Sequence, residues 1–232
     1  MKWILRVTFV LLLLIIIAQF FLPGTVATAM ENALQEQWKL QEVQVNIYAF
    51  PAVKILTGKV DRAEIFAPST VFGMVPVNDI YIELHEIKVG VIGVLQNDLN
   101  YKMHRTGTVE FKITEKRLNE YLQANPIDGL SNIAVELSED ISRVKSQITI
   151  LGTQVDFTLL GRFTLKDDNL LFIPEDFKVD EHSLGDLFKD KFEAGTNLEF
   201  KLGTLPYDTR LNRLETGEKT ITFYGTIGFL KI

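Results

Sequence analysis

Apolar and polar residues alternate along most of the chain after residue 42, the pattern of strands that bury one face. Most of these runs end at Gly, Asp or Asn residues, which favour turns. We therefore predict a long antiparallel sheet in the body of the chain. The alternating runs are residues 43–49, 80–84, 109–113, 133–137, 144–150, 155–159, 198–202 and 221–223.

The alternation slips by one position within one run. Ile80, Ile82 and Leu84 share a face, but after His85-Glu86 the pattern continues at Ile87. A slip of this kind is typical of a β-bulge, which bends its strand. The slip predicts a curved sheet.

Turns and strand starts can also be assigned. Three segments have the Gly or Asx residues that tight hairpins require: Leu151-Gly152-Thr153, Lys166-Asp167-Asp168-Asn169 and Thr216-Gly217-Glu218. Gly58-Lys59-Val60 and Gly161-Arg162-Phe163 each follow an apolar run and are expected to open a strand.

Two segments follow a helical period instead. From Pro23 to about Leu40, apolar residues recur at spacings of three and four and form one stripe. Thr114 is placed to cap a helix that runs to Leu122. The apolar residues between Phe177 and Phe192 fit either a helix or a loop.

The N-terminus has the features of an export segment. Lys2 and Arg6 precede an apolar run from Val7 to Leu22, so the positive-inside bias places the remainder of the chain outside the cytoplasm. Counted from Trp3, the run is close to the roughly 20 residues that span a bilayer, which favours a retained anchor. Ala27-Thr28-Ala29 is also an acceptable cleavage site, so cleavage near Ala29 and secretion is the alternative. We predict a signal anchor or signal peptide at 1–29 and one extracytoplasmic domain at 30–232.

Composition argues against several functional classes. The net charge is −6 and cations are dispersed among acids, so we expect no nucleic-acid partner. There is no cysteine, and no two of His85, His104 and His182 lie at metal-ligand spacing, so we expect no metal and no cofactor. Asp167-Asp168 fits a turn better than a catalytic pair. No nucleophile elbow or phosphate loop is present, and we predict that the chain is not an enzyme.

Several short motifs, in this order, resemble the LmeA-like phospholipid-binding family of bacterial envelopes, which is grouped with tubular lipid-binding folds. They are Glu31-x-x-Leu34, residues 50–60 (FPAVKILTGKV), residues 113–122 (ITEKRLNEYL), Gly161-Arg162-Phe163, and Leu205-Pro206 with a closing strand at Gly225. The resemblance covers residues 23–232. It implies an α+β fold in which a strongly curved antiparallel β-sheet wraps around one or two amphipathic helices and encloses an apolar groove for acyl chains, without a cofactor.

The physical chemistry of lipid binding is consistent with this pattern. Shielding an acyl chain of roughly 16 carbons is worth on the order of 10 kcal/mol at about 0.8 kcal/mol per CH₂, and only a continuous apolar trough supplies it. We therefore predict phospholipid or another acyl-chain lipid, and the membrane, as partners; the sequence identifies no protein partner. The predicted lipid-binding residues are Leu34, Trp38, Val45, Ile47, Ile82, Leu84, Leu118, Tyr121, Leu122 and Phe157.

Alternatives remain for these residues and for the whole chain. Each of the inward apolar residues can equally be plain core packing, and Trp38 and Tyr48 fit either the core or a membrane interface. The chain can also be an anchored structural or interaction module of the envelope with no lipid cargo. Hydrolysis of a lipid or glycan stays open only because catalytic groups can assemble in space without a local motif.

Overall fold

The fold was analysed in a computed structural model of the chain. It describes residues 2–38, 40, 42–72, 75–90, 101–103, 105–126, 130–150, 153–179, 182–183, 198–200, 202, 205 and 208–228. The predicted turn at Leu151-Gly152 and the apolar residues between Leu184 and Phe192 lie outside these ranges.

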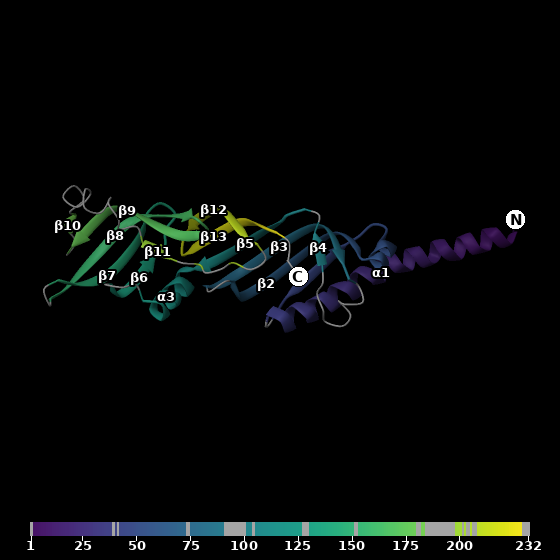
Figure 1. The fold of residues 1–232 in the computed structure, drawn as a ribbon, viewed down its shortest axis with the longest axis horizontal. Helices are drawn as coiled ribbons and strands as arrows, with labels where there is room; N and C mark the ends of the chain where they lie inside the picture. Colours follow the sequence, from purple (N-terminus) through teal and green to yellow (C-terminus); the bar gives the residue numbers. More distant parts are fainter. Residues whose placement is uncertain are drawn as a thin grey trace.

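A single long helix, α1 (Lys2–Trp38), forms the N-terminal part of the molecule. Its first half projects away from the sheets, and its second half lies along them (Figure 1). It is long and apolar enough to cross a membrane, with a mean hydropathy of 2.6 over its most apolar window, none of which is buried. The predicted export segment and the predicted helix from Pro23 are therefore one continuous helix.

Seven strands form the first sheet, which curls into a half-barrel around the second half of α1 (Figure 1). Its order is β1-β2-β3-β5-β13-β12, with β4 paired to β3, and the pairings are antiparallel. The elements are β1 (Gln44–Tyr48), the 3₁₀ helix η1 (Ala52–Thr57), β2 (Lys59–Phe72), β3 (Val75–Val89), β4 (Tyr101–Met103), β5 (Gly107–Thr114), β12 (Arg210–Gly217) and β13 (Thr220–Ile227).

The burial alternation of β3 slips at two positions in this curled sheet. Leu84 and Ile87 are both buried, and Glu86 between them has a positive φ of 50°. The predicted slip is confirmed, but β2 and β3 keep one register across it, with Arg62 opposite His85. The second slip, at Asp79 with φ 48°, was not predicted, and the register of β3 against β5 shifts there.

Six strands form the second sheet, in the order β10-β9-β8-β7-β6 with β11 paired to β9. It lies at the end of the molecule away from the N-terminus (Figure 1). The strands are β6 (Ser131–Glu136), β7 (Ser142–Ile150), β8 (Thr153–Lys166), β9 (Asn169–Val179), β10 (His182–Ser183) and β11 (Leu198–Phe200).

The described turns and strand starts test the sequence predictions. The hairpin at Asp167 and Asp168 is confirmed: both have positive φ, and Lys166 pairs with Asn169. The hairpin between β12 and β13 turns at residues 218–219, one position later than predicted, because Gly217 itself pairs with Thr220. Lys59 opens β2 as predicted.

Gly161 does not open a strand, which corrects the prediction. It lies in the middle of β8, beside a register shift against β9. A Cβ at this position would lie 2.1 Å from the carbonyl oxygen of Ile173 and 2.8 Å from the Cα of Pro174. Glycine is therefore required by the close approach of β9 and not by a strand start.

Helix α3 (Glu115–Ala124) connects the two sheets. The predicted cap is confirmed, since the hydroxyl of Thr114 accepts a hydrogen bond of 3.3 Å from the Arg117 amide. Leu118 and Leu122 are buried, and the helix contacts β3, β5 and β6.

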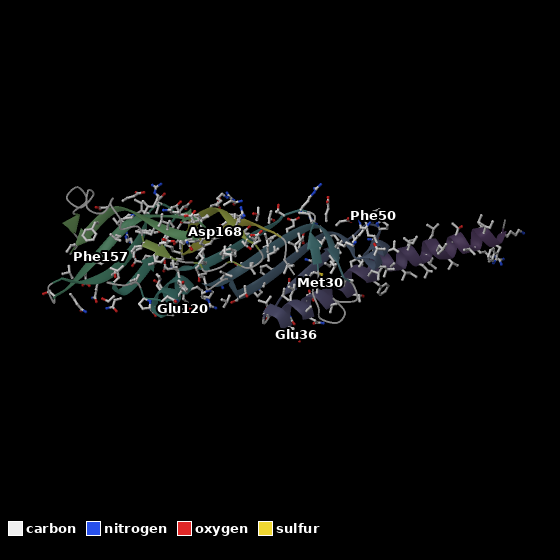
Figure 2. All side chains as sticks on the ribbon, in the orientation of Figure 1. Met30, Glu36, Phe50, Glu120, Phe157 and Asp168 are labelled. Carbon is white, nitrogen blue, oxygen red and sulfur yellow. The ribbon has the colours of Figure 1, made fainter. Side chains whose placement is uncertain are left out.

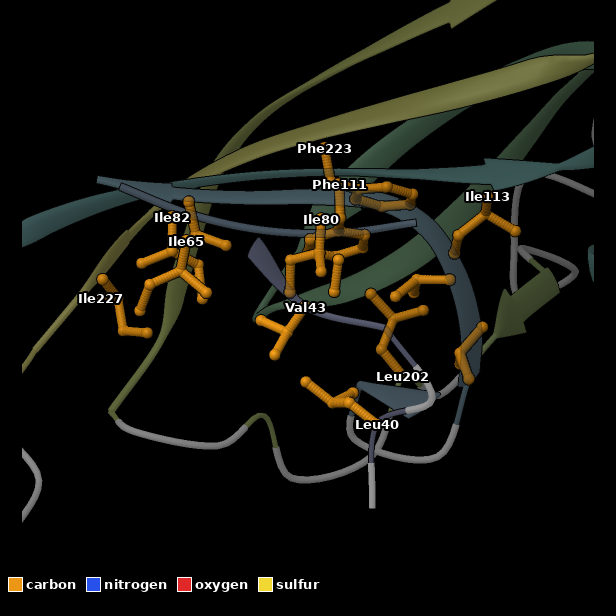
Figure 3. Close-up of a cluster of buried hydrophobic side chains, with 14 of the residues drawn as sticks. Leu40, Val43, Ile65, Ile80, Ile82, Phe111, Ile113, Leu202, Phe223 and Ile227 are labelled. Atoms are coloured by element: carbon orange, nitrogen blue, oxygen red, sulfur yellow. The ribbon is translucent and has the colours of Figure 1, made fainter. Parts of the chain in front are cut away.

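Among the described residues, one apolar cluster runs through both sheets and through α1 and α3. Figure 3 shows part of it, with Phe111, Phe223 and Ile82 below the curled sheet and Leu40 and Leu202 across from them. Among the described residues, the buried polar side chains are Ser142, Ser146 and Thr209, and none is charged. The interior is therefore continuous and almost entirely apolar.

Candidate functional site

The candidate site is this apolar interior, which begins where α1 packs on the half-barrel. Two rows of side chains cross the sheet on its inner face. One row joins Val45 to Ile65 and Ile65 to Ile82, and the other joins Ile47 to Ala63 and Ala63 to Leu84. All of these residues are buried. Four predicted lipid-binding residues thus lie in adjacent rows of one apolar surface.

Helix α1 closes the open side of the half-barrel. Leu34 is buried in the same cluster, and the Glu31 carboxylate accepts a 2.8 Å hydrogen bond from the amide of Val45 on the edge strand β1. The helix is thereby held in register against the strand. The side chain of Trp38, which was predicted to bind lipid, lies outside the described residues.

Helix α3 brings three more predicted residues to the cluster. Leu118 and Leu122 are buried, and Tyr121 packs against the cluster while half-buried. Burial raises the pKa of the Tyr121 phenol, because the charged form is poorly solvated there. This side of the interior is apolar as well.

Phe157 marks the far end of the interior. It stacks on Phe177 with ring centroids 5.6 Å apart, and it pairs across the strands with Val179. Figure 2 shows Phe157 at the end of the molecule remote from Phe50. Phe177 and Val179 are only half-buried, so this end is less closed than the end near α1.

Phe177 and Val179 are candidate contacts that the sequence analysis did not assign. Phe177 was placed in a segment that fits either a helix or a loop, whereas it lies in strand β9. The two-residue spacing of Phe177 and Val179 was the available signal, but Pro174 and the two acids that follow it break the alternation before Phe177. The pairing of β8 with β9 places Val179 opposite Phe157 and Phe177 two residues away, so the three side chains share one face.

Tyr48 does not lie in the core, which was one of its two expected positions. Its side chain is exposed, the Arg62 guanidinium lies 4.2 Å from the ring centroid, and its hydroxyl bonds to Glu64 at 3.1 Å. The core interpretation of Tyr48 is therefore wrong, because a residue of β1 at an even position faces away from α1.

Side chains of the cluster contact one another closely where the cluster is best buried. Phe111 and Phe223 stack at 4.9 Å between centroids, with an interplanar angle of 11°. Leu34, Val45, Ile47, Ile82, Leu84, Leu118 and Leu122 all belong to the same buried cluster. An acyl chain at the α1 end would have to separate these side chains.

Two of the hollows are lined by described residues, and each borders the cluster at one buried residue, Phe157 in one and Phe163 in the other. The larger has a volume of about 510 Å³ and includes Phe157, with Arg143, Lys145 and Lys178 around it. The Glu136 carboxylate pairs with both Arg143 and Lys145, and the hydrogen bond from Lys145 lowers its pKa most. The smaller hollow, about 210 Å³, lies where β12 meets β8. The larger hollow is charged and does not resemble an acyl channel.

No group of three or more His, Asp or Glu residues that could hold a metal ion occurs in the described part of the chain. What the described interior offers a ligand is apolar surface to pack against. The wall that provides it is a curled sheet closed by a helix.

The sequence comparison agrees with this geometry. Residues 17–226 match a protein family described as LmeA-like phospholipid-binding. No curated protein and no solved structure matches the chain. The matched region contains both sheets, α3 and the part of α1 that packs on β1. Because the match spans nearly the whole chain, the protein belongs to the LmeA-like phospholipid-binding family.

Proposed function

We propose that the protein binds a phospholipid or a related acyl-chain lipid in its apolar interior, at the outer face of the cytoplasmic membrane, for lipid transfer or envelope lipid homeostasis. The observation that carries the proposal is the uninterrupted apolar cluster, which extends from α1 through both sheets and contains no buried charge among the described residues. Membership of a phospholipid-binding family supports it. The protein acts as a binder and not as an enzyme.

Retention of α1 as an anchor is part of the proposal. Cleavage after Ala29 would cut the helix inside its packed half, where Val26, Ala27 and Met30 are buried. It would also remove Gln19, whose side chain binds the backbone of Ala49 and Ala52. With Lys2 and Arg6 in the cytoplasm, the domain then stands outside.

Within the interior, the far end is the better position for the acyl chain. The inner face near Phe157 is bordered by the half-buried Phe177 and Val179, so separating side chains there exposes less apolar surface than at the α1 end. We place the lipid tail along the inner face of β8 and β9, with the rows near α1 as the continuation of the same surface.

The test uses residues 25–232, which keep the buried part of α1 and lack most of the apolar span. The purified domain is incubated with vesicles that contain a phospholipid carrying a diazirine on its acyl chain, irradiated, and mapped by mass spectrometry. We expect cross-links on inner-face residues such as Phe157, Phe177 and Val179. Matched outer-face positions on the same strands, Thr158 and Lys178, serve as the control.

Solvent extraction of the same preparation gives an independent result. Co-purified lipid in the extract, together with inner-face cross-links, supports the proposal. Cross-links distributed equally over inner and outer faces, or an extract without lipid and no uptake of a fluorescent phospholipid, would contradict it.

A second function is favoured by one observation. The tight stacking of Phe111 on Phe223 and the burial of the rows near α1 are what a solid core requires. A structural or interaction module of the envelope would need no more than this. The cross-linking experiment separates the two functions, because a solid core takes up no lipid.

A further inference from the structure

The loop between β1 and β2 is fixed to α1 within the apolar span of the helix. The Gln19 amide donates a 3.2 Å hydrogen bond to the carbonyl of Ala49, and its oxygen accepts a 2.8 Å bond from the amide of Ala52. From Trp3 to Leu22 the helix rises about 29 Å at 1.5 Å per residue, close to the hydrocarbon thickness of roughly 30 Å. Gln19 lies about 4.5 Å below Leu22 along this axis.

The outward face of the fixed loop is apolar. Phe50 is 80% exposed and Leu56 is 62% exposed, with Val53 between them also exposed. Val53 and Leu56 are three residues apart in η1, so they share one face of this 3₁₀ helix, while Ala52 and Ile55 are buried on another. Figure 2 shows Phe50 at the end of the domain from which the free half of α1 emerges.

The polar groups of the loop have partners within the loop and β2. The Asp61 carboxylate accepts a 2.9 Å bond from the Phe50 amide and pairs with the ammonium of Lys54. That ammonium also donates to the Phe50 carbonyl at 2.8 Å. The Gly58 amide bonds to the carbonyl of Ile55 at 2.7 Å. These bonds lower the cost of placing the loop where water is scarce, because unpaired backbone groups are costly there.

We propose that Phe50, Val53 and Leu56 form a membrane foot that enters the outer leaflet beside α1. The occupant of this surface is the lipid of the bilayer, because Gln19 holds the loop at a depth inside the apolar span. A depth of about 5–10 Å at the headgroup and acyl boundary is usual for apolar surfaces of this kind. The inference rests on the proposed retention of α1 in the membrane and is independent of any lipid cargo.

The absence of cysteine from the chain makes a direct test possible. Leu56→Cys in the full-length protein is labelled with an environment-sensitive dye and reconstituted into vesicles of phosphatidylethanolamine and phosphatidylglycerol. We expect blue-shifted emission and quenching, several-fold above the control, by lipids that carry a nitroxide high on the acyl chain. A water-soluble iodide quencher should act weakly.

Two further single-cysteine variants complete the design. Ile141→Cys is the matched control, since Ile141 is 40% exposed and precedes β7 in the sheet remote from the emerging helix. A dye on Leu13→Cys reports whether the apolar half of α1 is immersed in the bilayer. If the Leu56 dye matches the Ile141 dye while the Leu13 dye is immersed, the membrane foot is wrong and the anchor stands. If the Leu13 dye is also in water, both the foot and the retained anchor are contradicted.

Discussion

The carboxylate of Asp61 on β2 holds the proposed membrane foot in place, because it accepts a hydrogen bond from the Phe50 amide and pairs with Lys54. The hydrogen bond from Lys54, and then that from the Phe50 amide, hold the pKa of its carboxyl below the ordinary value of 3.8. Because the folded-state pKa is depressed, the stabilisation is complete above the unfolded-state pKa and is lost as pH falls through the folded-state pKa. Asp61 is half-exposed, so the ion pair contributes at most about 1 kcal/mol.

We therefore expect Asp61→Asn to lower the free energy of unfolding of residues 25–232 by less than about 1 kcal/mol at neutral pH. The difference from the wild type should shrink as pH falls below about 4. Urea unfolding over a pH series measures it. A difference that stays constant down to acidic pH would show that the charge of Asp61 has no role in the loop.

Gly161 offers a second test at the residue level. In Gly161→Ala the new methyl meets the backbone of Ile173 and Pro174, which cannot move without disturbing the pairing of β8 with β9. We expect a loss of about 2 kcal/mol or more in the free energy of unfolding.

Gly217→Ala is the control for this substitution. Its methyl would find the Thr220 hydroxyl at 3.4 Å, an ordinary contact, so stability should change by no more than about 0.5 kcal/mol. Equal effects of the two substitutions, measured by chemical denaturation, would mean that close strand approach is not the reason for Gly161.

One side chain from each of α1 and α3 bonds to an edge strand, α1 to β1 in the first sheet and α3 to β6 in the second. Glu31 of α1 accepts a hydrogen bond from the Val45 amide on the edge strand β1. On the edge strand β6, Asn119 of α3 both donates to the Val135 carbonyl at 2.8 Å and accepts from its amide at 2.7 Å. Unpaired edges promote association between chains, so we expect these contacts to oppose pairing of other chains with β1 and β6.

The two hydrogen bonds from Asn119 to the edge strand β6 allow a prediction about the stability of α3 variants. Asn119→Ala leaves both Val135 backbone groups without their partner, and we expect a loss of about 1–3 kcal/mol in the free energy of unfolding. The exposed Glu120→Ala on the same helix should cost at most about 0.5 kcal/mol. Thermal unfolding compares them. Equal melting temperatures for the two variants would contradict a role for Asn119 on the strand edge.

The loop contact of α1 is testable in the same way. Gln19→Leu keeps the helix apolar but removes both hydrogen bonds to the loop. With the Leu56→Cys dye in place, we expect weaker quenching by nitroxide lipids and stronger quenching by iodide. Unchanged quenching would show that the loop is held by contacts other than Gln19.

Much of the element pattern was predictable, because strands with one buried face leave a two-residue period. The strands at Val43–Ala49 and Val109–Ile113, the Asp167-Asp168 hairpin and the Thr114 cap all follow from local residues. The middle position of Gly161 was not predictable, since it depends on a backbone that arrives from another strand.

The candidate site was predictable only as a face and not as a cavity. Alternation identifies residues such as Ile82 and Leu84 as inward, and the structure buries them. The same alternation fits a filled core and a lipid groove equally well, because it reports burial and not what lies opposite. Gln19 was overlooked as one polar residue in an apolar run, since its partners are 30 and 33 residues away.

At the scale of the whole molecule, the apolar first half of α1 and the half that packs on the sheets form one helix. A chain that begins at Met30 lacks Val26 and Ala27, whereas one that begins at Thr25 keeps them. Burial of an aliphatic side chain such as Val26 is worth about 1.5–3 kcal/mol. We expect the shorter chain to unfold with a free energy lower by about 2 kcal/mol, as measured in urea. Equal stabilities would remove this argument against cleavage at Ala29.

With α1 retained in the membrane as proposed, its continuity through Pro23 would also determine how the molecule stands on the bilayer. A flexible tether would let the sheets lie flat on the headgroups, whereas a continuous helix from the proposed anchor into the fold would hold them at a fixed angle to the bilayer. Figure 1 shows the sheets extended along roughly the direction of the emerging helix. The tilt of the proposed span would then set the height of β8 and β9 above the bilayer, and changes in bilayer thickness that alter this tilt would raise or lower that far end.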